Sequence, residues 1–348
     1  MPEYRQDPLT GRTVIVAEER AARPHQFDIT DMPFQGVCPF CEGNESLTPS
    51  EIAAFRPVGT TPNSLGWSVR VVPNKYPAVV PGDVPPILLD HTFIHVGGQA
   101  DGIGIHEVIV DTPRHVLSVS ELTPSEVADM LAMYRQRLQV LRTDSRWAYV
   151  QIFKNVGAAA GASLPHSHSQ LVAIPFLPSS LLQMLHRAEA YAQKHQCCFW
   201  CEQIQSEIQF GERIVEKTEH FVVLCPFVSR FAGEIEIYPQ NHESGFDELD
   251  VSVLDELAKL FRRTIIRLEK AVVWMKTPVA YNIVLHTEPF RWVQNGNSDD
   301  FVPFFHWRFS ILPSLARAAG FEWGTGLHIN PISPEQAARR LREAVSEP

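Results

Sequence analysis

The sequence has no long apolar run free of charge, and it does not open with basic residues followed by an apolar stretch. The first absence excludes a transmembrane helix, which needs about 20 consecutive apolar residues, and the second argues against a secretory signal. Lysine and arginine are outnumbered, 30 against 40 acidic residues, which gives a net charge of -10. Because this charge repels polyanions, nonspecific binding to nucleic acid or to an anionic membrane is disfavoured. We expect a globular, cytoplasmic protein in which local cations hold any phosphate ligand.

Cysteine is scarce, and four of the six cysteines form two closely spaced pairs. The pairs are Cys38-Pro39-Phe40-Cys41 and Cys198-Phe199-Trp200-Cys201. In a protein without a secretion signal, this C-x-x-C spacing indicates metal ligands more than disulfides. A pair of buried, reduced thiols is the alternative at each position.

Each C-x-x-C pair opens a half of the chain, and the two halves repeat one order of elements. A strand-like segment that ends on a histidine follows each pair, at residues 106–115 and 234–242. Twelve residues after that histidine comes the first apolar position of an amphipathic helix, with apolar residues at steps of 0, 3, 7, 11 and 14 in both halves. These residues are Val127, Met130, Tyr134, Leu138 and Leu141, and then Leu254, Leu257, Phe261, Ile265 and Leu268. A strand with another histidine, at 165–175 and at 306–313, closes each half.

This repetition predicts an α+β fold made of a duplicated unit. We expect an antiparallel sheet and one long helix in each half, packed with pseudo-two-fold symmetry. The N-terminal half, residues 1–190, would carry the catalytic strand and one metal site. The C-terminal half, residues 191–348, would carry the second metal site and an extra polar loop over residues 291–300.

Each half supplies two cysteines and two histidines, the tetrahedral sulfur and nitrogen shell that zinc prefers. The first predicted site is Cys38, Cys41, His115 and His166, and the second is Cys198, Cys201, His242 and His306. His286 competes with His306 for the fourth position of the second site. Since four protein ligands leave no open position for substrate, we expect two structural zinc ions per chain.

The predicted chemistry centres on His168, which lies two residues after His166. Alternate residues of a strand point to one face, so a metal held by His166 would place His168 rigidly. A neutral imidazole, with a reference pKa of about 6.5, can attack phosphorus and form a phosphoramidate. A buried core histidine is the alternative.

Small and neutral polar residues surround this histidine in the sequence. The run of small residues from Asn155 to Ser163 would let backbone amides approach a phosphate, and close packing is its alternative. Asn155 and Gly161 are candidate substrate contacts within it. Ser163 and Gln170 are neutral donors that can stabilise charge on the phosphoryl oxygens.

Two further segments hold candidate ligand contacts. Arg20 and Arg23 could bind a sugar phosphate bidentately, although either could also be a solvated surface charge. Residues 67–76 are predicted to form a strand that enters a turn, and there Asn74 could contact a base or ribose or serve only as a turn residue.

Over nearly the whole chain, these motifs resemble the galactose-1-phosphate uridylyltransferase family, a branch of the histidine-triad superfamily. The resemblance covers residues 7–11, the Arg20 and Arg23 segment, Cys38 and Cys41, Asn74, His115, residues 155–170 and residues 334–338. It implies two histidine-triad-like halves, a homodimer and a ping-pong reaction with a nucleotidylated His168. It also implies that Gln170 contacts the transferred phosphoryl group, and that Arg20, Arg23, Asn74, Asn155 and Ser163 lie near the nucleotide sugar.

Within this resemblance, particular residues narrow the activity. Related hydrolases have a third histidine where this chain has Gln170, which favours transfer over hydrolysis, and Arg308 replaces the nucleophile in the second half, which implies one active site per chain. Ser167 stands where classical members have proline, and residues 324–330 replace their hexose-binding segment. Both features are similar to the ADP-glucose:phosphate adenylyltransferase branch.

The resulting prediction is a nucleotidyltransferase that moves a nucleoside monophosphate from a nucleotide sugar to a sugar 1-phosphate, as in UDP-glucose:hexose-1-phosphate uridylyltransferases. The alternative is adenylyl transfer from ADP-glucose to inorganic phosphate. A hydrolase and an inactive nucleotide-binding sensor are weaker alternatives, and the sequence leaves the base open.

Overall fold

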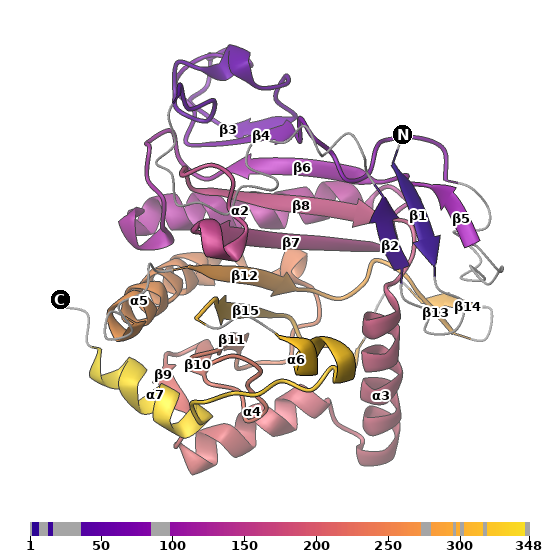
Figure 1. Cartoon of the computed structure of the whole chain (residues 1–348), viewed down its shortest axis with the longest axis vertical. Helices are drawn as coiled ribbons and strands as arrows, with labels where there is room; N and C mark the ends of the chain where they lie inside the picture. Colours follow the sequence, from indigo (N-terminus) through magenta and orange to yellow (C-terminus); the bar gives the residue numbers. More distant parts are fainter. Residues whose placement is uncertain are drawn as a thin grey trace.

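A ten-stranded sheet runs through the centre of the molecule (Figure 1). The structure is a computed structural model, and it describes residues 2–6, 13–16, 36–84, 98–272, 280–294, 297–299, 303–315 and 319–344. Every neighbouring pair in this sheet is antiparallel. Its order is β3 (Ala53–Phe55), β4 (Val69–Pro73), β6 (Ile105–Val110), β8 (His168–Ile174), β7 (Tyr149–Val156), β12 (Tyr281–His286), β15 (Arg308–Pro313), β11 (Ile235–Pro239), β10 (Phe221–Leu224) and β9 (Ile214–Lys217).

Two smaller sheets and the helices complete the described structure. The small sheets are β2 (Thr13–Val16), β1 (Glu3–Gln6) and β5 (Gly98–Asp101), and the hairpin of β13 (Trp292–Gln294) and β14 (Asn297–Asp299). The helices are α2 (Pro124–Arg142), α3 (Ser179–His195), α4 (Phe199–Phe210), α5 (Leu254–Val272), α6 (Gly320–Thr325) and α7 (Pro334–Glu343). Short 3-10 turns include η4 (Ala158–Ala160). No helix in the described part of the chain is both long and apolar enough to span a membrane.

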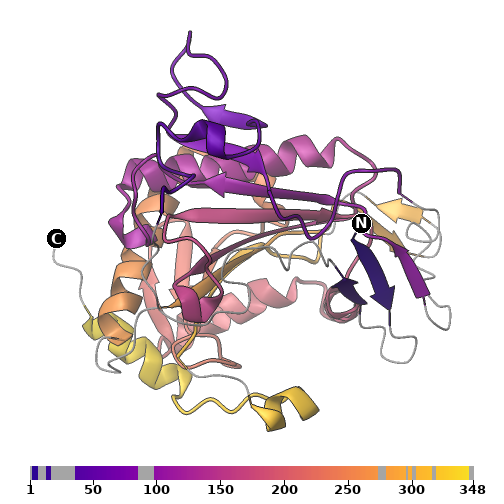
Figure 2. The same ribbon diagram turned by 45° about the horizontal axis from the view of Figure 1, so that its top comes forward.

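The two long helices, α2 and α5, form where the apolar periodicity predicts them. Helix α2 begins with Thr123 as N-cap, Pro124 in its first turn and Glu126 completing a capping box. All ten residues of the repeated apolar pattern are buried in one core with the inward residues of the sheet. Helices α3 and α4 belong to a second core on the opposite face of the sheet, and Figure 2 shows α2 and α3 on opposite sides of it.

The two halves share one continuous sheet, where the sequence predicted a separate sheet in each half. Strand β7 of the first half pairs with β12 of the second, with Asn155 opposite Asn282. This pairing provides hydrogen-bond partners for backbone donors and acceptors that would otherwise be exposed along two strand edges. Part of the predicted polar loop at 291–300 is the β13–β14 hairpin, and residues 295, 296 and 300 lie outside the described residues.

Four histidines lie just outside the strands that were predicted to contain them. Strand β6 ends at Val110, five residues before His115, and β11 ends at Pro239, before His242. His166 and His306 each stand two residues ahead of β8 and β15. In both halves the chain leaves the sheet where its imidazoles approach a cysteine pair.

Candidate active site

The register of the sheet places His168 and Gln170 on the face opposite α2. Leu171 and Ala173, which alternate with them along β8, are buried in the core that contains α2. Gln170 pairs with Val108 of β6, and Val108 in turn pairs with Val72 of β4. Because directly opposed residues of antiparallel strands point to the same face, these side chains form a common floor.

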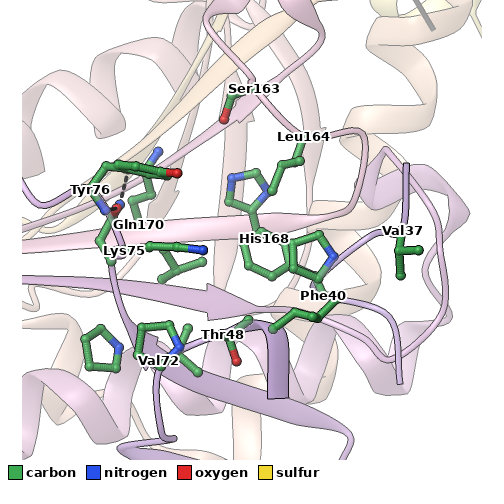
Figure 3. Close-up of a pocket in the computed structure, with 16 residues that line it drawn as sticks. Val37, Phe40, Thr48, Val72, Lys75, Tyr76, Ser163, Leu164, His168 and Gln170 are labelled. Atoms are coloured by element: carbon green, nitrogen blue, oxygen red, sulfur yellow. Dashed lines mark hydrogen bonds between the residues drawn. The ribbon is translucent and has the colours of Figure 1, made fainter. Parts of the chain in front are cut away.

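A pocket of about 370 Å³ lies over this floor (Figure 3). That volume is within the range of about 300–1,000 Å³ that is typical of small-ligand sites. Its lining is mainly apolar, with polar groups from Thr48, Asn74, Ser163, His168 and Gln170. The described lining residues are Val37, Pro39, Phe40, Leu47, Thr48, Pro49, Val72, Pro73, Asn74, Lys75, Tyr76, Val108, Ser163, Leu164, His168 and Gln170.

His168 is held in one tautomer. Its Nδ1 lies 2.7 Å from the carbonyl oxygen of His166, and because a carbonyl can only accept, Nδ1 must carry the proton. The lone pair is therefore on Nε2. Burial lowers the pKa of His168 to about 4, so the ring is neutral at pH 7. A neutral imidazole with its Nε2 lone pair available is the form that can act as a nucleophile.

A buried polar network anchors the backbone beneath His168. The ammonium of Lys154 donates to Asp111 Oδ2 at 2.5 Å, to Ser167 Oγ at 2.8 Å and to the carbonyl oxygen of His168 at 3.2 Å. Asp111 also accepts from the hydroxyls of Ser167 and Ser169. Sequence reasoning missed this network. The network could have been recognised from Lys154 itself, because this lysine alternates along β7 with the same periodicity as the buried residues Val150, Ile152 and Val156.

Gln170 is fixed by two neighbours on the pocket floor. Its Oε1 lies 3.0 Å from His106 Nε2 and 3.4 Å from Asn74 Nδ2. Asn74 also accepts a hydrogen bond from the backbone N–H of Tyr76 through Oδ1. Asn74 therefore lines the pocket and also stabilises a turn, and its contact with a base or ribose stays a prediction. His106 was not among the predicted site residues.

The run of small residues forms a loop beside the pocket. Gly157 and Gly161 have positive φ angles of 81° and 86°, which favour glycine. Asn282 of the second half donates to Asn155 Oδ1 and to the carbonyl oxygen of Ala160, both at 2.8 Å. Among the predicted residues of this loop that the structure describes, Ser163 lines the pocket, and Asn155 and Gly161 do not.

The first predicted metal site is assembled. The ligand atoms of Cys38, Cys41, His115 and His166 all lie within 4.8 Å of one another. Cysteine Sγ to histidine Nδ1 distances are 3.3 Å for Cys41 to His115, 3.5 Å for Cys38 to His166 and 3.7 Å for Cys41 to His166. A tetrahedral zinc, with Zn–S near 2.3 Å and Zn–N near 2.0–2.1 Å, would separate sulfur and nitrogen by about 3.6 Å. His166 Nε2 donates to the Thr112 carbonyl at 2.9 Å, which leaves Nδ1 free to ligate.

The second predicted site has the same geometry. Cys198, Cys201, His242 and His306 form the group, with Cys201 Sγ 3.3 Å from His242 Nδ1 and 3.6 Å from His306 Nδ1. His306 Nε2 lies 3.0 Å from the carbonyl oxygen of Pro239. His166 Nε2 makes the equivalent contact with the carbonyl oxygen of Thr112. His306 thus completes this group, and the competing His286 lies on β12 opposite Arg308.

In the second half, Arg308 forms an ion pair and lies over an indole ring. Arg308 stands two residues after His306, as His168 stands after His166. Its Nε lies 3.2 Å from Glu236 Oε1, and its guanidinium carbon lies 5.4 Å from the centre of the Trp200 ring. In the first half, the ring that corresponds to Trp200 is Phe40, which lies 5.1 Å from the His168 ring.

Lys75 is the charged member of the pocket lining among the described residues. Its nitrogen points towards the middle of the pocket in Figure 3. Sequence reasoning assigned the local cations to Arg20 and Arg23, which lie outside the described residues. Lys75 was missed because a lysine at an exposed turn carries no distinctive pattern.

Two family models match this chain. The model of the galactose-1-phosphate uridyl transferase N-terminal domain matches residues 1–178, and a domain of unknown function, DUF4921, matches residues 104–347. These matches, with the similarities below, define the chain as a nucleotidyltransferase. It belongs to the galactose-1-phosphate uridylyltransferase family.

Two curated relatives match along all or nearly all of their length. ADP-glucose phosphorylase of Arabidopsis thaliana is 33% identical, over 98% of this chain and 93% of the relative. Galactose-1-phosphate uridylyltransferase of Thermotoga maritima is 30% identical, over 100% of both. Among solved structures, the Arabidopsis ADP-glucose phosphorylase with bound ADP-glucose has a TM-score of 0.72 at 32% identity, covering 100% of both chains. A uridylyltransferase structure has a TM-score of 0.76 at 26% identity, covering 98% of both.

Proposed function

We propose that this enzyme transfers a nucleoside monophosphate from a nucleotide sugar to a phosphate acceptor through a covalent intermediate on His168. The observation that carries the proposal is the tautomer of His168, with Nδ1–H bound to the His166 carbonyl and Nε2 unprotonated beside the pocket. Nε2 attacks the α-phosphorus, and the bond from that phosphorus to the bridging oxygen breaks. Sugar 1-phosphate leaves with the electron pair. In the second step, an oxygen of the acceptor attacks the same phosphorus, and Nε2 recovers its lone pair.

Neutral and cationic side chains around the pocket would stabilise the charge on the transferred group. Gln170 and Ser163 would donate to the non-bridging oxygens, and Lys75 would attract the diphosphate of the donor. Asn74 would contact the nucleoside, with Asn155 and Gly161 shaping the adjoining loop. Arg20 and Arg23 stay predicted contacts of the sugar phosphate.

Zinc is the metal that we propose for both cysteine and histidine groups. Two thiolates and two imidazoles at tetrahedral separations are its preferred donor set. Zinc would supply a rigid cross-link rather than a reactive centre, since each group already offers four ligands. Cys38, Cys41, His115 and His166 would thereby fix the strand that presents His168.

For the donor and acceptor, we propose ADP-glucose and inorganic phosphate. The support is the 33% identity to an ADP-glucose phosphorylase over 98% of this chain, together with Ser167 between the two histidines. The second candidate is UDP-glucose with a hexose 1-phosphate as acceptor. It is supported by the matching family model and by the Thermotoga uridylyltransferase.

We also propose that the chain is a duplication whose halves, 1–190 and 191–348, are related by a pseudo-two-fold axis. The support is the strand order, which reads β3-β4-β6-β8-β7 from one edge to the centre and β9-β10-β11-β15-β12 from the other. Among the strands of the ten-stranded sheet, each half follows the same chain order of three strands, a long helix and two strands. The homodimer and the cytoplasmic location stay predictions.

The intact mass of the protein after incubation with ADP-glucose or with UDP-glucose, without acceptor, tests this function. An adenylyl adduct on the wild type that is absent from His168→Ala supports the ADP-glucose proposal, and a uridylyl adduct supports the second candidate. If neither donor leaves an adduct, the covalent mechanism is wrong. Phosphate or galactose 1-phosphate added afterwards should discharge the adduct if that compound is the acceptor; glucose 1-phosphate, the leaving group of both donors, should discharge it in either case by reversing the first step.

A further inference from the structure

His106 is a buried residue that contacts two residues of the pocket lining, Asn74 and Gln170. It lies on β6, only 6% exposed, and pairs with Val172 of β8. Its two ring nitrogens face different groups. Nδ1 lies 2.9 Å from the backbone nitrogen of Ala78, and Nε2 lies 3.0 Å from both Gln170 Oε1 and Asn74 Nδ2.

These partners determine the protonation of the His106 ring. The Ala78 N–H can only donate, so Nδ1 must accept and cannot carry a proton. In the neutral ring the proton is then on Nε2, which donates to Gln170 Oε1. Asn74 Oδ1 is engaged by the Tyr76 N–H, so the Asn74 NH₂ group faces His106 Nε2 at 3.0 Å and Gln170 Oε1 at 3.4 Å. Because a protonated Nε2 cannot accept a hydrogen bond, the Asn74 amide donates to the same Gln170 oxygen.

Two donors that converge on one oxygen fix the orientation of the Gln170 amide. The carbonyl end of the amide is held towards β6 and Asn74. The other end, an NH₂ group with two donors, is left for the pocket that Gln170 lines. An anionic phosphoryl group attracts that NH₂ end and repels the carbonyl end. A free glutamine would interconvert the two orientations by rotating its last side-chain torsion.

We propose that His106 is a positioning residue for nucleotidyl transfer, which orients the Gln170 amide so that its NH₂ group faces the transferred phosphoryl group. This inference rests on the proposed function, because it needs a phosphoryl group beside Gln170. His106 itself does not touch the reacting atoms. It acts by removing the orientation of Gln170 that would place a carbonyl oxygen against the negative charge.

If the role of His106 were purely structural, it would depend on Nδ1 rather than on Nε2. Through Nδ1, His106 also holds the Ala78 N–H and thus the turn that follows Asn74. The two roles separate in a matched pair of variants. His106→Asn places an amide oxygen near the position of Nδ1 and keeps an acceptor for Ala78, but it has no group at Nε2. His106→Gln places an amide NH₂ near the position of Nε2 and keeps a donor for Gln170.

The test measures the single-turnover rate of adduct formation on His168 by quenched-flow mass spectrometry, and the donor dissociation constant separately. We expect His106→Asn to slow adduct formation about 10- to 100-fold, less than the roughly 10²- to 10³-fold cost of removing a transition-state donor outright. Donor affinity should change by less than about threefold. His106→Gln should recover most of the rate.

A double variant tests whether His106 acts through Gln170. In the Gln170→Ala background, His106→Asn should cause almost no further loss, because no amide is left to orient. Equal losses in His106→Asn and His106→Gln, or losses that multiply with Gln170→Ala, would overturn the positioning role while leaving the covalent mechanism intact. A wild-type protein that forms no adduct with either donor would overturn the proposed function itself. The thermal midpoints and metal contents of all the variants identify any that have lost the fold.

Discussion

Replacing Lys154 by methionine tests how much the network beneath His168 contributes to stability. The ammonium of Lys154 and the carboxylate of Asp111 have side chains only 1% and 0% exposed, and they lie 2.5 Å apart. Lys154→Met keeps most of the side-chain volume but leaves a buried carboxylate without its counter-charge. Breaking a buried pair in this way costs about 3–5 kcal/mol. With an unfolding entropy of about 2.1 cal/mol/K per residue, that loss lowers the melting temperature by roughly 4–7 °C for this chain length.

The assay is thermal unfolding of the metal-loaded protein, with Lys154→Met/Asp111→Asn as the matched control. The double variant removes the orphaned charge and keeps one oxygen, which can accept from Ser167 or from Ser169, because the two hydroxyls bind different oxygens of Asp111. We expect it to recover more than half of the loss, and to leave about 1–2 kcal/mol for the missing hydrogen bonds. A double variant as unstable as Lys154→Met, or a single variant within about 1 °C of wild type, would refute the idea that uncompensated charge is the main cost.

Three further predictions concern the metal, the donor and pH. Cys41→Ser is expected to lower bound zinc from the two ions predicted for the two ligand groups to one per chain, measured by mass spectrometry of the metal, whereas Cys197→Ser leaves the content unchanged. Lys75→Met is expected to weaken nucleotide-sugar binding by about two- to fivefold, less at high salt, and a calorimetric titration equal to that of wild type would contradict this. The Glu256 carboxylate accepts from His220 Nδ1 at 2.6 Å and raises the pKa of that histidine. Protonated His220 therefore stabilises the fold below its unfolded pKa of about 6.5, and the gain is lost as pH rises through the higher folded value. The stability advantage of wild type over Glu256→Gln should be greatest at about pH 5 to 6.5 and should shrink above it, and an advantage that does not vary with pH would exclude this ion pair as its source.

Local periodicity predicted the elements that bury one face. Helices α2 and α5 were predictable because their apolar residues recur with the helical period and are all buried. Helix α3 was not predicted, and it buries only Leu181, Leu185 and Ala188, too few for a clear stripe. The join between β7 and β12 was missed because the paired residues are more than 120 positions apart in the sequence and no local pattern encodes which strand edges meet.

In the candidate site, the metal ligands could be predicted from the sequence, and several supporting residues could not. Both metal groups could be assembled from the sequence because cysteine and histidine at repeated spacings have few other uses. His106 and Lys154 were missed because their partners lie on neighbouring strands, and only the register brings them together. Asn282 was missed for the same reason, since it acts on the loop of the other half.

The pairing of β7 with β12 has a consequence for what each half could do alone. A fragment that ends at residue 190 would expose an eight-residue strand edge along β7, an open template for aggregation. It would also lose the Asn282 amide that holds the loop next to Ser163. The C-terminal half thus protects the strand edge of the half that contains His168. Under the proposed mechanism, substitutions in β12 should therefore affect activity, although this strand contributes no residue to the described lining of the pocket.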